Sequence, residues 1–99
     1  MGALDLLRPA GRARGRARRI HEPIAVPAKR NGYFPQAFVW RGQRHDVRSV
    51  ESCRTEVRRG WQGRVERHLF RVRTASAIFE LAQDLARDTW HVEQMWVKE

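Results

Sequence analysis

The sequence has little cysteine and no long apolar run. Cys53 is its single cysteine, which excludes an internal disulfide and a cysteine-based metal cluster and is typical of the reducing cytosol. None of its apolar stretches approaches the roughly 20 residues that a membrane-spanning helix needs. We therefore expect a cytoplasmic protein that does not enter the membrane.

Lysine is almost as scarce. Lys29 and Lys98 are the two lysines, so 18 of the 20 basic residues are arginines, and 11 acidic residues leave a formal charge of +9. A positive field of this kind attracts polyanions and favours a nucleic-acid partner. A GC-rich genome would produce the same preference for arginine over lysine. The composition is consistent with both explanations.

The first 19 residues lack an apolar face. They hold six arginines and one acidic residue, Asp5, and so carry +5, whereas residues 20–99 carry +4. Arginine alternating with alanine and glycine cannot bury enough surface to offset the entropy lost on ordering. We predict a disordered Arg-rich tail over residues 1–19 and one small domain over residues 20–99.

From Ile20 onward, alternating apolar residues and turn dipeptides predict strands. Pro23–Val26 begins with one proline and precedes another, a pattern typical of an edge strand. The pairs Asn31-Gly32 and Arg41-Gly42 predict turns. The clearest strand is Glu66–Thr74, which alternates apolar and basic residues. This pattern predicts a mainly β fold, a small antiparallel, strongly bent sheet or partly open barrel of about five to six strands.

The segment Ser76–Asp88 fits this pattern poorly. Its alanine, leucine and glutamate favour a helix, and four apolar residues have helical spacing: Ile78, Leu81, Ala82 and Leu85. Propensity alone predicts a helix here.

No constellation of residues indicates catalysis or metal binding. Cys53 with a histidine is the minimal set for thiol catalysis, but many small proteins contain as much. His45, His68 and His91 fall in three predicted strands, beside arginines that would repel a cation. We expect no enzyme activity, no cofactor and no bound metal.

Arginines alternate with aromatic residues, a combination that suits nucleic acid because guanidinium binds phosphate and aromatic rings stack on bases. Trp61 lies between glycines and is the best candidate for an exposed ring, although it could equally anchor its loop to the core. Together with the tail, the predicted phosphate contacts are Arg12, Arg14, Arg16, Arg18, Arg19, Arg41, Arg44, Arg71 and Arg73. The last four would form a patch on one face of the sheet.

A second kind of contact is suggested by the stretch Ala3–Leu7. It resembles the pentapeptide that binds the bacterial sliding clamp, with Leu4, Asp5 and Leu6 matching and Leu7 in the place of phenylalanine. A short N-terminal helical turn would give the same residues.

Residues 20–99 resemble a family of small bacterial domains of uncharacterised function, also found as the C-terminal domain of Y-family DNA polymerase-like (mutasome) proteins. The resemblance lies in Pro23–Val26, Ala37–Val47, Glu66–Val72 and Trp90–Val92. It implies that Ile78–Leu81 is a strand beside the strand of Phe70. We therefore predict a strand over Ala77–Leu81, with a short helical turn over Gln83–Arg87.

Two functions follow from these features. The first is a non-enzymatic accessory domain that binds nucleic acid, DNA rather than RNA, or a DNA-repair assembly, through the Arg-rich tail and sheet face. About six phosphate contacts predict a log–log salt slope of about −5 on duplex DNA. The alternative is a protein-interaction module that engages a polymerase or sliding clamp through Leu4–Leu7, the edge at Pro23–Val26 or the loop at Trp61.

Overall fold

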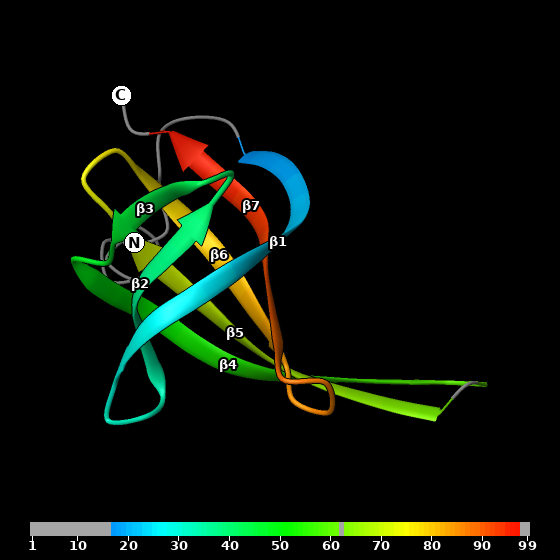
Figure 1. The fold of residues 1–99 in the computed structure, drawn as a ribbon. Helices are drawn as coiled ribbons and strands as arrows, with labels where there is room; N and C mark the ends of the chain where they lie inside the picture. The colour runs from blue at the N-terminus through cyan, green and yellow to red at the C-terminus, as the bar shows by residue number, and fades with distance from the viewer. Residues whose placement is uncertain (1–16, 62, 98–99) are drawn as a thin grey trace, which may run out of the picture.

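The computed structural model describes residues 17–61 and 63–97, which form seven antiparallel strands in one open sheet. The strands are β1 (Ala17–Arg30), β2 (Phe34–Trp40), β3 (Gln43–Asp46), β4 (Ser49–Gly60), β5 (Gly63–Arg73), β6 (Ala77–Asp84) and β7 (Thr89–Val97). Their order across the strongly curved sheet is β3-β2-β1-β7-β6-β5-β4 (Figure 1). The all-β prediction is confirmed, but the sheet has more strands than the five to six predicted.

The long strand β1 lies in the middle of the sheet. Its first half pairs with β7 and its second half with β2, and the register shifts between Ala25 and Ala28. The prediction that Pro23–Val26 is an edge strand is therefore wrong. The register shift spans Pro27, so this residue, which has no N–H to donate, lies at an irregularity rather than inside a regular ladder.

The boundary predicted for the tail is also wrong. Ala17, Arg18 and Arg19 lie in β1, opposite Trp96, Met95 and Gln94 of β7. The pairing with β7 orders a segment that has no apolar face of its own. Residues 1–16 lie outside the described part of the chain.

Both predicted turns are present. Asn31 and Gly32 have φ of 57° and 66°, and Arg41 and Gly42 have φ of 54° and 77°. Positive φ at both central residues matches the twist of two-residue hairpins and favours asparagine and glycine. These turns connect β1 to β2 and β2 to β3.

Strand β6 confirms the strand predicted over Ala77–Leu81 and continues to Asp84. The helical turn predicted over Gln83–Arg87 is wrong, because the strand is followed by a turn over 85–88. Asp84 Oδ1 accepts hydrogen bonds from the backbone N–H groups of Ala86 and Arg87. This contact stabilises the turn.

The core lies on the inner face of the sheet, the face that carries Phe70 and Phe79. The largest fully buried side chains are Phe38, Phe70, Phe79, Leu81, Val72, Val92 and Pro35. The rings of Phe38 and Phe79 meet edge to face with centroids 5.1 Å apart, and Phe70 stacks on Trp90 at 5.6 Å. Phe38 of β2 thus packs across the curved sheet onto β6.

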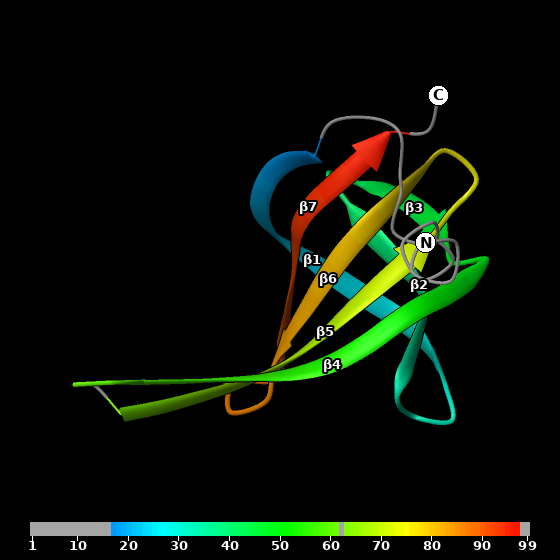
Figure 2. The same ribbon diagram turned by 180° about the vertical axis from the view of Figure 1, so that it is seen from behind.

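Strands β4 and β5 extend well beyond the other strands as a two-stranded ribbon, here called the arm (residues 57–66; Figures 1 and 2). Gly60 pairs with Gly63, so the strands continue almost to the tip. The segment around Trp61, predicted as a loop or wide turn, is mostly strand. Val57 and Val65 in the arm are each 43% exposed.

Within residues 17–61 and 63–97, no helix is long and apolar enough to cross a membrane.

Candidate nucleic-acid interface

Two of the five predicted tail contacts lie in the described part of the chain. Arg18 and Arg19 are exposed residues of β1 rather than members of a free tail. Arg12, Arg14 and Arg16 lie outside the described residues, as does the predicted clamp-binding stretch Leu4, Asp5, Leu6 and Leu7.

The four arginines predicted to share one sheet-face patch do not come together. Arg41 and Arg44 lie on the β2–β3 hairpin, whereas Arg71 and Arg73 lie on β5. The sequence pattern places a residue on a face, but only the fold decides which strands adjoin.

Arg41 has a structural partner. Its Nε donates to Glu22 Oε1 at 2.8 Å and its Nη2 to Glu22 Oε2 at 2.7 Å, while its guanidinium lies 4.6 Å from the centre of the Trp40 ring. The hydrogen bond from Arg41, followed by that from Trp40, lowers the pKa of Glu22 from 4.5 to about 2. The Arg41 side chain therefore fastens the β2–β3 turn to β1.

The other three have partners as well. Arg44 Nε donates to Asp46 Oδ1 at 3.0 Å, and Arg73 Nε donates to Glu51 Oε2 at 2.9 Å. Arg71 lies 4.6 Å from the centre of the Trp96 ring. Arg41, Arg44 and Arg73 thus have carboxylate partners and Arg71 lies over an aromatic ring, which makes them poorer candidates for phosphate binding than an arginine without such contacts.

The outer face of the sheet, the face opposite the core, has a groove of about 450 Å³ whose lining mixes both signs of charge. Arg67 Nη2 donates to Glu56 Oε1 at 2.6 Å and its Nη1 lies 3.5 Å from Glu93 Oε2. The hydrogen bond from Arg67 lowers the pKa of Glu56. Burial lowers the pKa of Arg67, but the carboxylates of Glu56, Glu93 and Glu80 together outweigh burial and raise it. The groove is an ion-pair network rather than a site for an anion.

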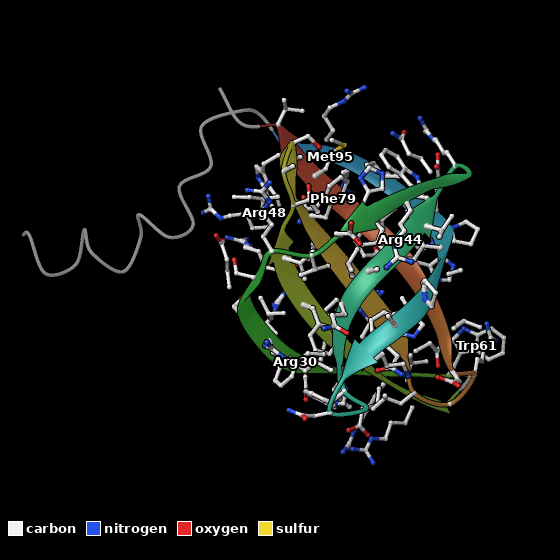
Figure 3. The ribbon with its side chains drawn as sticks, turned by 60° about the vertical axis from the view of Figure 1, so that its left-hand side comes forward. Arg30, Arg44, Arg48, Trp61, Phe79 and Met95 are labelled. Carbon is white, nitrogen blue, oxygen red and sulfur yellow. The ribbon has the colours of Figure 1, made fainter. Side chains whose placement is uncertain are left out.

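The tip of the arm is different. Trp61 is 92% exposed and is the only large aromatic side chain with this exposure among the described residues. It projects away from Phe79 in the core (Figure 3). Of the two alternatives in the sequence, the exposed ring is the one observed.

Three arginines of the arm lie close to Trp61 along the chain, Arg59 and Arg64 on one face of the ribbon and Arg58 on the other. Arg59 lies opposite Arg64 across the ribbon, and Arg58 lies opposite Val65. Arg58 lies 3.8 Å from Glu56 and Arg64 lies 3.6 Å from Glu66, both beyond hydrogen-bond distance, and no carboxylate lies within ion-pair distance of Arg59 in the described part of the chain. Sequence reasoning missed these arginines, although "RRGWQGR" with glycines at a hairpin spacing carried the signal.

Other groups that could react or bind a ligand are few among the described residues. Cys53 is exposed, and its Sγ lies 3.2 Å from the hydroxyl of Tyr33, which raises the pKa of that hydroxyl. Between Ala17 and Val97, apart from residue 62, no group of three or more His, Cys, Asp or Glu side chains is placed to hold a metal ion.

Neither the curated proteins nor the solved structures include a match to this sequence. The profile of the family described as "Domain of unknown function (DUF6504)" matches residues 13–98, which is most of the chain. The chain therefore belongs to the DUF6504 domain family.

Proposed function

We propose that this domain is a non-enzymatic module that binds nucleic acid through the tip of the β4–β5 arm. The observation that carries the proposal is the placement of Trp61, 92% exposed at the end of a projecting ribbon. Leaving an indole in water forfeits the stabilisation that burial would give, about 25 cal/mol per Å² of apolar surface. The position is explained if the ring meets a partner.

The charges around Trp61 indicate the chemistry of that partner. Arg59 and Arg64 lie opposite each other on one face of the arm and Arg58 lies on the other face, with Glu56 and Glu66 as the carboxylates that Arg58 and Arg64 approach. Guanidinium groups bind phosphate through paired N–H donors, and an exposed indole stacks on an unpaired base. A stacking ring needs a base that is free of its own stack, so we propose single-stranded nucleic acid.

The test is a fluorescence-anisotropy titration of a labelled oligothymidylate at several salt concentrations. The variant R58A/R59A/R64A removes the arginines of the tip. The matched control R30A/R48A/R87A removes three exposed arginines that form no ion pair with another described residue. Both variants lose the same charge.

We expect the arm variant to reduce the log–log salt slope by about 2, since each phosphate contact contributes about 0.7 on a single strand. The control should keep the wild-type slope. W61A should weaken binding by about 5-fold to 150-fold, because one stacked base is worth roughly 1–3 kcal/mol. Equal losses in the arm variant and the control would reduce the interaction to general charge attraction and overturn the proposal.

The resemblance to C-terminal domains of Y-family polymerase-like proteins favours DNA and a translesion assembly as the setting. A matched pair of DNA and RNA oligonucleotides tests the first point, with DNA expected to bind more tightly. The contribution of Arg12, Arg14 and Arg16 is tested by deletion of residues 1–16, which leaves β1 intact. If nucleic acid does not bind and a polymerase or clamp does, the protein-interaction alternative replaces this proposal.

A further inference from the structure

We propose that the free edge of β4 pairs with β4 of a second copy of this chain, in an antiparallel arrangement centred on Thr55. This inference does not rest on the proposed function. It starts from the two edges of the sheet, β3 and β4. Strand β3 has 4 residues, whereas β4 has 12 and pairs with β5 alone among the described strands. A long strand edge presents unpaired N–H and C=O groups that another strand can join.

The part of β4 beyond its bulge is regular. The register with β5 shifts only between Val50 and Ser52 and then runs without interruption to Gly60. Bulges usually protect an edge by twisting it away from partners. Here the bulge lies before Ser52, so the stretch from Ser52 to Gly60 keeps a regular edge with which another strand can pair.

The side chains of this stretch are self-complementary about Thr55. Antiparallel pairing centred there places Arg54 opposite Glu56 of the second copy, and Glu56 opposite its Arg54. On the other face, Thr55 lies opposite Thr55 of the second copy, and Cys53 opposite its Val57. Opposite charges and β-branched or threonine pairs each stabilise cross-strand contacts. Arg54 Nη2 donates to Glu80 Oε2 at 3.4 Å, but its side chain is 59% exposed, so its other N–H groups are accessible to a second copy.

Neighbouring registers that keep the same faces together are disfavoured by charge. A centre at Arg54 places Arg54 opposite Arg54 of the second copy. A centre at Glu56 places Glu56 opposite Glu56, and Arg54 opposite Arg58. Like charges directly opposite each other destabilise a sheet. The order of charged residues along β4 therefore favours pairing with a second copy of this chain, in the register centred on Thr55.

The arrangement also accounts for the arm. A two-stranded ribbon is marginally stable on its own, yet β4 and β5 extend past the rest of the sheet, as the reverse view shows clearly (Figure 2). Pairing about Thr55 places Val57 and Arg58 against Cys53 and Ser52 of the second copy. The base of each arm becomes part of a four-stranded sheet, and the faces and tip stay free.

The test combines sedimentation equilibrium of the full chain with disulfide trapping. In the variant C53S/T55C, the two introduced thiols face each other across the two-fold axis, with Cα atoms about 4.5–5.5 Å apart. This lies inside the range of about 4.4–6.8 Å that a disulfide needs. The matched control C53S/S52C places its thiol on the same edge, six residues out of register with its copy.

We expect a dimer in sedimentation, and rapid disulfide-linked dimer formation by C53S/T55C but not by the control or by C53S. A Tm within a few degrees of wild type shows that each variant is folded. A chain that sediments as a monomer, with C53S/T55C linking no faster than C53S/S52C, overturns the proposal. A dimer in which both variants link equally fast also overturns it, because the register is then wrong. Nucleic-acid binding by a monomer would leave the proposed function standing while this inference fails.

Discussion

Arg67 and Arg41 of the sheet body are held at short range by carboxylates, whereas the arginines of the arm lie farther from any carboxylate. Arg67, 20% exposed, holds Glu56 at 2.6 Å, and Arg41 holds Glu22 at 2.7 Å. Arg58, 72% exposed, lies 3.8 Å from its nearest carboxylate. The body uses arginine to fasten strands together. The arginines of the arm hold no carboxylate at such short range, and this difference is one reason for placing the proposed nucleic-acid contact on the arm.

The same contrast holds for aromatic side chains. Phe79 is 1% exposed and touches Phe38, Trp40 and His45, while Trp61 is 92% exposed. Replacing Phe79 with alanine should lower the free energy of unfolding by about 3–5 kcal/mol, the usual cost of a cavity in a core. Replacing Trp61 should change it by less than about 0.5 kcal/mol. Denaturant titration of F79A and W61A measures both, and a large loss in W61A would mean that the indole supports the fold.

Arginine substitutions in the sheet body and in the arm should differ in the same way, with smaller changes in the free energy of unfolding. R67A leaves Glu56 and Glu93 without their shared partner, so we expect a loss of about 1–2 kcal/mol in the free energy of unfolding. R59A should change the stability by no more than about 0.5 kcal/mol. Denaturant titrations of R67A and R59A measure both changes in the free energy of unfolding. Equal losses would remove the distinction between structural arginines and arginines of the tip.

The smallest expected effect is a pH dependence in the body. The pKa of Glu22 in the folded protein is about 2, below its ordinary value of 4.5. The ion pair with Arg41 therefore contributes stability above about pH 4.5, and this contribution is lost as the pH falls towards 2. E22Q should melt below wild type at neutral pH, and the difference should shrink as the pH falls through this window. A difference in Tm that is constant from pH 7 to pH 2 would contradict the assignment.

Whether a strand could be predicted from the sequence depended on whether one or both of its faces are buried. Strand β5 was predictable because its inner face carries Phe70 and Val72 while its outer face carries arginines. Strand β6 could be predicted from the family resemblance but not from alternation, because Ile78 and Ala82 on the outer face are almost as deeply buried as Phe79 and Leu81 on the inner one. With both faces covered, the alternation disappears and the remaining apolar spacing favours a helix.

The site was predictable only in part. Glycines on both sides of Trp61 indicated an exposed ring, which the structure confirms. The ion pairs could not be predicted from the sequence. Arg41 and Glu22, for example, are 19 residues apart and meet only through the register of β1 and β2. Sequence reasoning therefore placed Arg41 and Arg73 on a binding surface and overlooked Arg59.

The most direct test of the arm as the binding element uses the four tryptophans as probes, because each indole N–H gives one signal in a ¹⁵N-correlated NMR spectrum. Trp61 lies at the tip of the arm, while Trp40, Trp90 and Trp96 lie in the sheet body. On titration with oligothymidylate, we expect the Trp61 indole signal to shift in proportion to saturation and the other three to stay near their free positions. Shifts of Trp96 or Trp40 with an unchanged Trp61 would contradict it.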